Sequence, residues 1–360
     1  MFLKKYPSKH SIKKVASEHI NNDELKSFLK QRGIFSYCVK KGDLADILSS
    51  FYFNGNDYLE LKKKMDIEQN YKKTGRISFP TEKKQDLIES LIELNNTTIN
   101  ESDNTRIAVT RDGSNNLRVT LSYDEYKPSL IDLLDVNRRN ISIVLNQSED
   151  NCSLDYDINS PNDYKKIKEL LANIKVGLEE DAEIEFNEIT LENLTNTQRI
   201  ELFERFFHTI QTPWRLYELN KLKVKRNNDE QSVSTNNLQG INSAVLDGTN
   251  LKENQFVQST LEQGFYFSMA SMRLNKNDET NFIDLVIEFK SRPIMCEVRI
   301  NNSGRYVLDN GEVKEVKIVL EEILQDSLLM GFKDELHKVY NEILCEAVTV
   351  LEVAAETEDI

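Results

Sequence analysis

Three charged residues in the C-terminal third of the chain have the side-chain types that bind a metal ion and activate water. Asp284, Glu288 and Lys290 lie in the run Asp284-Leu-Val-Ile-Glu288-Phe-Lys290, where apolar residues separate the charged ones. Side chains two residues apart on a strand share a face, so a strand would point all three charged groups to one side. Carboxylates hold Mg²⁺, and a neighbouring lysine helps to polarise the attacking water. The run therefore has the residue types for Mg²⁺-dependent hydrolysis.

The same run resembles the metal-dependent nucleases of the D…ExK type, in which an apolar strand presents Glu-x-Lys. That resemblance implies DNA cleavage with Mg²⁺, carried out by Asp284, Glu288 and Lys290. The family takes its other acidic residue from a separate strand or turn, and Asp278 is the nearby candidate with a different placement. No cofactor is expected unless this alternative holds, in which case the cofactor is Mg²⁺.

A purely structural interpretation explains the run equally well, and we favour it. Leu285, Ile287 and Phe289 would form the buried face of a strand, and the charged residues would form its solvent-exposed face. The next run, residues 294–300, alternates in the same way. Two such runs joined by a short turn predict an antiparallel hairpin with opposite charges facing each other across the strands.

A second pattern, near the N-terminus, is typical of a small pair of helices with a basic surface. Leu25 and Leu29, and later Leu44 and Leu48, are spaced so that the two pairs meet in a miniature core, and Gly33 permits a sharp exit between them. The basic side chains remain outside this core: Lys26, Lys30, Arg32, Lys40 and Lys41. Backbone N–H groups at a helix N-terminus add to such an anion-binding surface.

The stretch Glu24-Leu-Lys-Ser-Phe-Leu-Lys-Gln-Arg-Gly-Ile34 resembles the first helix and turn of SAP-type (helix–extended–helix) DNA-binding modules. The resemblance covers about residues 21–53, and the loop after Ile34 is one residue longer and holds the bulky Phe35, Tyr37 and Val39. It implies salt-sensitive, weakly specific contacts with the phosphates of double-stranded DNA. A helical hairpin with solvated lysines is the alternative.

Charge is distributed unevenly along the chain. Residues 1–84 contain 18 Lys and Arg and 10 Asp and Glu, a net charge of +8. The remainder contains 28 Lys and Arg and 50 Asp and Glu, a net charge of −22. A basic segment attracts phosphates, whereas an acidic body is repelled by the same polyanion or faces a basic partner. The asymmetry favours a basic module attached to an acidic body.

Several classes of protein are disfavoured by the sequence. No run approaches the roughly 18 apolar residues of a membrane span, and the N-terminus lacks the apolar core of a secretory signal. The four cysteines are far apart, which favours free thiols in a cytoplasmic protein. The sequence contains no phosphate-binding loop, dinucleotide fingerprint, nucleophile elbow or HExxH motif.

The expected fold class is α+β: a small N-terminal helical module, then antiparallel β-sheet and helix blocks, closing with two C-terminal helices. The helices are expected at 315–330 and 332–351, separated at Gly331. The expected domains are a basic module at 1–55, a linker at 56–84, an α+β domain at 85–226, a polar linker or long loop at 227–255, and a β-meander with the closing helices at 256–360.

From these patterns we expect a non-enzymatic, nucleic-acid-associated protein. The SAP-like module would tether the acidic body to double-stranded DNA, and the body would contact a protein partner. The metal-dependent nuclease is one alternative. Another is a protein-binding adaptor or assembly subunit of a microbial or viral defence system, suggested by the Lys-, Asn- and Ile-rich chain. No membrane contact is expected, and the closing helices offer a surface for homo-oligomers.

Overall fold

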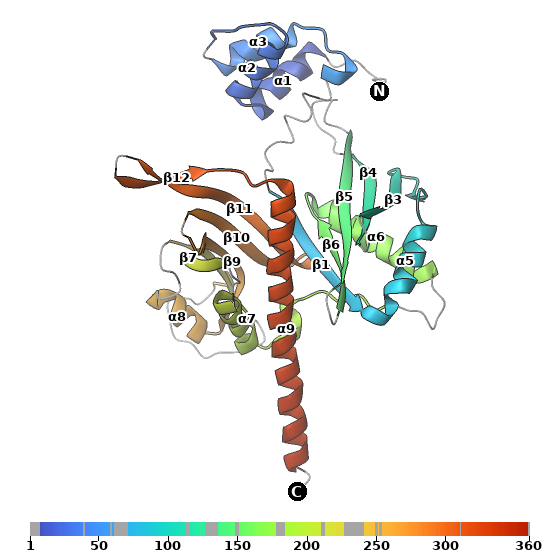
Figure 1. Ribbon diagram of the computed structural model, residues 1–360, viewed down its shortest axis with the longest axis vertical. Coiled ribbons are helices and arrows are strands. Elements are labelled where there is room, and N and C mark those ends of the chain that lie inside the picture. The colour runs from blue at the N-terminus through green and yellow to red at the C-terminus, as the bar shows by residue number, and fades with distance from the viewer. Residues whose placement is uncertain are drawn as a thin grey trace. The chain divides into compact units, whose positions relative to one another are not determined.

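The computed structural model describes residues 8–38, 40–57, 60, 71–112, 116–126, 136–147, 151–177, 184–209, 213–226, 241–248, 251, 254–278, 280–309 and 311–358. The chain divides into two compact units. One contains residues 1–70, 100–105 and 122–140, and the other contains residues 71–99, 106–121 and 141–360. The predicted α+β fold class is confirmed (Figure 1).

Three short helices form the N-terminal part of the first unit: α1 (Lys9–His19), α2 (Asn22–Gln31) and α3 (Lys41–Ser49). They enclose a core of their own, as the leucine spacing predicts. The buried side chains of this core are Ile12, Val15, Ala16, Ile20, Leu25, Phe28, Leu29, Leu44, Ala45, Leu48 and Phe53. Because these helices bury their apolar side chains against one another, the basic residues between those positions face outward.

One antiparallel sheet organises the rest of the described chain. Its strands are β1 (Lys73–Pro80), β2 (Thr98–Asn100), β3 (Thr105–Asp112), β4 (Asn116–Tyr126), β5 (Val136–Gln147), β6 (Asn151–Asp157), β7 (Trp214–Arg226), β8 (Ser243–Asp247), β9 (Phe265–Lys276), β10 (Asn281–Ser291), β11 (Ile294–Asp309) and β12 (Glu312–Lys317). The strand order is β2-β3-β4-β5-β6-β1-β11-β10-β9-β7-β8, and β12 pairs with β11. Strand β1 therefore joins two runs of strands that are distant in sequence.

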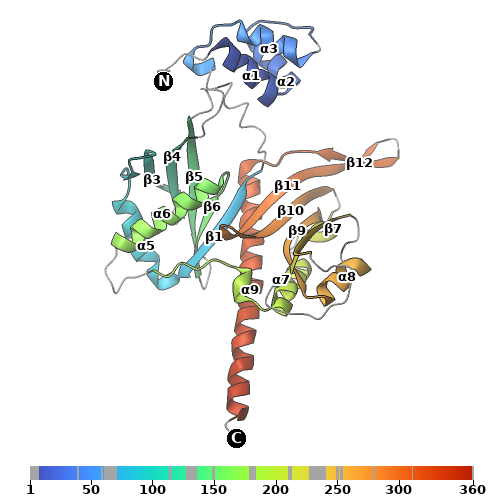
Figure 2. The same ribbon diagram turned by 180° about the vertical axis from the view of Figure 1, so that it is seen from behind.

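Helices lie on the faces of this sheet: α5 (Lys84–Glu93), α6 (Pro161–Gly177), α7 (Asn196–Thr209), α8 (Gln255–Glu262) and α9 (Glu322–Glu358). Helices α5 and α6 lie beside β3–β6, as the two opposite views show (Figure 2). Helix α7 packs on β9 and β10, where the ring of Phe203 lies 5.8 Å from those of Phe267 and Phe289. The apolar stripe of α9, from Leu329 to Ile343, joins the same core.

A close approach between β1 and β6 requires glycine at one position. Gly75 lies opposite Tyr156, whose ring is buried under α6 beside Tyr164. A Cβ atom at Gly75 would lie 2.6 Å from the Tyr156 ring, well inside van der Waals contact. The missing side chain thus makes room for a large aromatic group at the centre of the sheet.

Some element predictions are wrong. Residues 73–80, placed in the expected linker, form the central strand β1, and residues 243–247 of the expected polar loop form β8, which pairs with β7. Strand β8 is short and its residues are exposed or half-buried, and β1 begins with lysine and glycine, so local composition suggested loops.

The two expected closing helices are one helix. Helix α9 runs without a break through Gly331, because a glycine inside a helix costs only about 1 kcal/mol and buried residues on both sides hold the helix in place. Val316, which we assigned to the first of these helices, lies on the exposed strand β12 instead. Its apolar spacing matched a helix by coincidence.

Candidate functional site

The turn between α2 and α3 has the geometry that the sequence pattern predicts for a helical pair. Asn21 caps α2 in a reciprocal capping box with Glu24. At the other end, Gly33 has a φ of 74°, its N–H donates to the Lys30 carbonyl, and the N–H of Ile34 donates to the Leu29 carbonyl. These paired bonds end the helix in a Schellman motif, which requires the left-handed conformation that glycine adopts. The chain is thereby turned out of α2 at a fixed angle.

Three of the predicted basic residues face solvent around this turn. Lys26, Lys30 and Lys40 are exposed, and none of them forms an ion pair with another residue that the structure describes. Lys40 is also the N-cap of α3, and Lys41, in the first turn of the same helix, is half-buried. Because no carboxylate of a described residue pairs with these three ammonium groups, they can contact an anionic ligand.

Arg32 has a different environment. Its guanidinium lies 3.5 Å from the centroid of the Phe28 ring and donates to the Phe28 carbonyl at 3.1 Å. It also forms ion pairs with Asp57 and, at 3.3 Å, with Glu60. Four contacts within the protein hold this side chain, so Arg32 fixes the end of α2 and is not available to a ligand in the way the lysines are.

The charged residues of the β10 run lie on one face of the sheet, opposite the core. Ile283, Leu285, Ile287 and Phe289 are in the core, as the structural interpretation predicts, and β10 pairs with β11. Asp284 accepts hydrogen bonds from Arg273 at 2.8 and 3.1 Å. Glu288 lies between Lys223 and Arg299.

Lys290 likewise is paired, with Glu297 of β11, whose exposed fraction is only 1%. Every carboxylate of this run therefore has a cationic partner from a neighbouring strand. Across the described residues, no group of three or more His, Cys, Asp or Glu side chains is placed to hold a metal ion. The structure gathers Asp284, Glu288 and Lys290 on one face but surrounds them with arginines and lysines.

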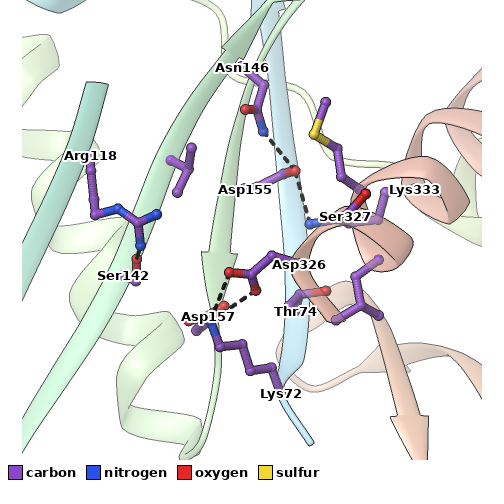
Figure 3. Close-up of a pocket in the computed structure, with 13 residues that line it drawn as sticks. Lys72, Thr74, Arg118, Ser142, Asn146, Asp155, Asp157, Asp326, Ser327 and Lys333 are labelled. Carbon is purple, nitrogen blue, oxygen red and sulfur yellow. Dashed lines mark hydrogen bonds and ion pairs between the residues drawn. The ribbon is translucent and has the colours of Figure 1, made fainter. Parts of the chain in front are cut away.

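A polar pocket that the sequence did not suggest lies between the sheet and the first turns of α9 (Figure 3). Its volume is about 170 Å³. Lys72 stands at one end, with its ammonium 2.9 Å from Asp326 and 2.7 Å from Glu322. Arg118, on β4, lies across the pocket from α9 and donates to the hydroxyl of Ser142 at 3.2 Å. Residues of β1, β4, β5 and β6 and the first turns of α9 thus line one polar space.

Asp155 is the centre of this polar region. Its carboxylate accepts hydrogen bonds from Arg76 at 2.6 and 2.9 Å and from Asn146 at 2.9 Å, and it lies 3.0 Å from the ammonium of Lys333. Although burial acts in the opposite direction, Lys333 and Arg76 lower the pKa of Asp155 to about 2. The carboxylate is therefore ionised and satisfied on both oxygens, and it links α9 to β1 and β6.

Neither Asp155 nor its partners were identified from the sequence. Arg76, Asp155 and Lys333 are far apart in the chain, and no local motif connects them. Strand alternation places Asp155 and Asp157 on one face of β6, a pattern that is equally typical of an ordinary solvated face. Within the described residues, no helix combines the length and the apolar composition needed to cross a membrane.

The comparison with protein families gives a match at the N-terminal end of the chain. The family described as GAPS4b protein N-terminal domain matches residues 12–69, a segment that contains most of α1 and all of α2 and α3. The match suggests a protein associated with a defence system, in agreement with one of the alternatives drawn from the sequence. No curated protein and no solved structure matches the chain.

Proposed function

We propose that this protein is a nucleic-acid-associated component of a defence system. In this proposal the N-terminal helices form a SAP-like module that binds DNA phosphates, and the module tethers an acidic α+β body that contacts a protein partner. The observation that carries the proposal is the set of three exposed lysines, Lys26, Lys30 and Lys40, without ion pairs among the described residues, around the turn of a helical pair with its own core.

The uneven charge of the chain supports nucleic-acid binding by its N-terminal segment and not by the rest of the chain. Residues beyond 84 carry a net charge of −22, so a polyanion repels them on average. A nucleic acid would be attracted to the basic segment alone, by displacement of its counterions. Contacts with phosphates position a duplex without reading its sequence, so the proposal predicts salt-dependent and weakly specific binding.

The partner contact in the proposal is supported by apolar residues exposed along β12 and the start of α9. Leu308 and Val313 lie opposite each other on β11 and β12, with exposed fractions of 75% and 67%. Ile323, near the start of α9, is also exposed. Strand β12 pairs with β11 on one side and is exposed at every residue. A strand edge and several exposed apolar side chains in one segment are typical of protein contact surfaces.

A gel-shift experiment with Mg²⁺ tests the DNA-binding part of the proposal and also reports cleavage. Labelled duplex DNA is incubated with the full chain at about 50 mM and about 200 mM salt, the range over which phosphate contacts weaken strongly. The proposal predicts a shift that is lost at the higher salt, and intact DNA in every lane. The variant Lys26→Glu/Lys30→Glu/Lys40→Glu should lose the shift at both salt concentrations.

Two results of the same gel would count against the proposal. If the wild-type chain gives no shift at low salt, the N-terminal module does not tether the chain to duplex DNA. If the DNA is cut and Glu288→Ala abolishes cutting while the shift remains, the chain is a nuclease and the paired carboxylates of β10 rearrange to bind Mg²⁺. The paired state of Asp284 and Glu288 is why we favour the tether.

A further inference from the structure

Two aromatic side chains of the N-terminal module lie in solvent although the module has a closed core. Phe35 is 71% exposed and Tyr37 is 96% exposed. Ile34 and Cys38, on either side of them, pack against the core, and Ser36 between them is half-buried. Alternation of this kind is the period of an extended chain, so Phe35 and Tyr37 point to the same side, away from the core.

The fold does not account for these two rings. The module encloses its core without them, and an exposed aromatic ring keeps its large apolar surface in water. Two residues on an extended chain advance by about 6.6 Å, which is about twice the 3.4 Å spacing of stacked bases. Each of the two exposed rings offers a face on which an unpaired base can stack.

Positive charge lies at both ends of the aromatic segment. Lys30 is in the last turn of α2, before the segment, and Lys40 is the N-cap of α3, after it. Both ammonium groups are exposed. Binding sites for single-stranded nucleic acids combine these two components, aromatic rings that stack bases and cations that follow the backbone. In a duplex the faces of the bases are already stacked, so the rings would have nothing to contact.

We propose that the segment between α2 and α3 stacks unpaired bases on Phe35 and Tyr37, so that the module binds single-stranded nucleic acid in preference to duplex. This inference rests on the proposed nucleic-acid tether and specifies its ligand. The flanking lysines favour a polyanion as the occupant of the platform over an apolar protein surface. A single-stranded ligand also explains why the loop is bulkier than a duplex-binding turn requires.

A strand that contains 2-aminopurine tests the inference directly, because the emission of this base changes when it stacks. The full chain is mixed with a labelled 12-nucleotide strand, or with its duplex, and both anisotropy and 2-aminopurine emission are recorded. We expect tighter binding of the strand and a change in emission. Phe35→Ala/Tyr37→Ala should weaken strand binding by about ten-fold or more and abolish the emission change.

Two control variants separate stacking from other effects. Tyr52→Ala removes another exposed ring of the same module, one with an exposed fraction of 84%, and should bind as the wild type does. Tyr37→Phe keeps the ring and loses the hydroxyl, so it should retain both the affinity and the emission change. Because all of these positions are exposed, the variants should have the circular dichroism spectrum of the wild type.

Three outcomes would overturn the inference. Equal binding of strand and duplex, with no loss in Phe35→Ala/Tyr37→Ala, would leave the tether in place and remove the stacking platform. Normal nucleic-acid binding by that double variant, with loss of a protein that co-purifies with the wild-type chain, would assign the rings to a protein contact. Absence of binding to either ligand at low salt would refute the proposed tether and the inference together.

Discussion

The ammonium of Lys333, on α9, lies 3.0 Å from the carboxylate of Asp155, on β6, and the two side chains have exposed fractions of only 4% and 10% (Figure 3). Arg76 bonds the same carboxylate and also Asp334, one residue beyond Lys333. Ion pairs this deep need their partners, because an unpaired buried charge is far more costly than the pair itself is stabilising. One carboxylate thus fixes the position of the polar side of α9 against the sheet.

Removal of this carboxylate charge should destabilise the sheet unit strongly. In Asp155→Asn, Lys333 and Arg76 lose the carboxylate that they share, and a broken buried pair of this kind costs about 3–5 kcal/mol. Asp326→Asn is the matched control, because Asp326 is much more exposed and its pair with Lys72 should contribute about 1 kcal/mol or less. Urea unfolding followed by circular dichroism measures both, and equal effects would contradict the assigned role of Asp155.

Acid should weaken the same region before the ordinary carboxylates titrate. Burial, together with the neighbouring Arg76, lowers the pKa of His337 to about 3, and its Nδ1 lies 3.3 Å from the Ser78 hydroxyl. In the unfolded chain a histidine titrates near 6.5, so between about pH 6.5 and pH 3 the unfolded state binds a proton that the folded state does not. The free energy of unfolding should therefore decrease as the pH is lowered through this range, by at most about 1.4 kcal/mol per pH unit.

The variant His337→Gln isolates this effect. Glutamine has no titrating group, so the free energy of unfolding of the variant should change less between pH 7 and pH 5 than that of the wild type. Asp155, with its lowered pKa, is stabilising above about pH 4 and begins to lose this contribution only as the pH falls toward 2. Urea unfolding at pH 5, 6 and 7 gives the slope of the free energy of unfolding against pH for the wild type and for the variant. Parallel slopes would show that His337 does not titrate on unfolding.

The central strand should not tolerate a side chain at Gly75. Gly75→Ala places a methyl group against the Tyr156 ring, which is packed under α6 and cannot move away, so the free energy of unfolding should fall by about 1–3 kcal/mol. Gly248→Ala, in the same unit, makes only an ordinary 3.7 Å contact with Leu251 and should change stability by less than about 0.5 kcal/mol. Thermal unfolding compares the two variants, and a neutral Gly75→Ala would show that β1 and β6 lie farther apart.

Arg32 and Lys30, two residues apart, should behave oppositely. Arg32→Ala removes the stacking on Phe28 and the pairs with Asp57 and Glu60, so it should destabilise the helical module by about 1–3 kcal/mol. Lys30→Ala should leave the module stable and weaken nucleic-acid binding. Hydrogen exchange at the amides of Leu25 to Leu29 reports the stability of the module alone. Faster exchange in Lys30→Ala than in Arg32→Ala would reverse these assignments.

The sequence predicted elements wherever local pattern decides the structure. The leucine spacing and Gly33 gave α2, the turn and α3, and strict alternation gave the pairing of β10 with β11. Strand β1 was missed because its partners, β6 and β11, are separated from it by more than 70 residues. Glycine and lysine at its start suggested a linker. Its role depends on neighbours that local composition does not reveal.

The predictions of site residues succeeded and failed for the same reason. Charged residues were located from local spacing, but whether a charge is free depends on the residues that the fold brings to it. Arg32 has the same sequence signal as Lys30. However, Asp57 and Glu60, which lie 25 and 28 positions later in the chain, form ion pairs with Arg32. Conversely, Arg76 and Asp155 carried no signal, because the pair forms only when β1 and β6 meet.

The salt dependence of nucleic-acid binding tests the central claim most directly. Fluorescence anisotropy gives the dissociation constant of the full chain for a labelled oligonucleotide at several salt concentrations, for the wild type and for Lys26→Glu/Lys30→Glu/Lys40→Glu. The tether predicts that log K falls linearly with log salt for the wild type, and that the variant binds weakly with a slope smaller by about one for each lysine that contacts a phosphate. Equal affinity and equal slope in the two proteins would contradict it.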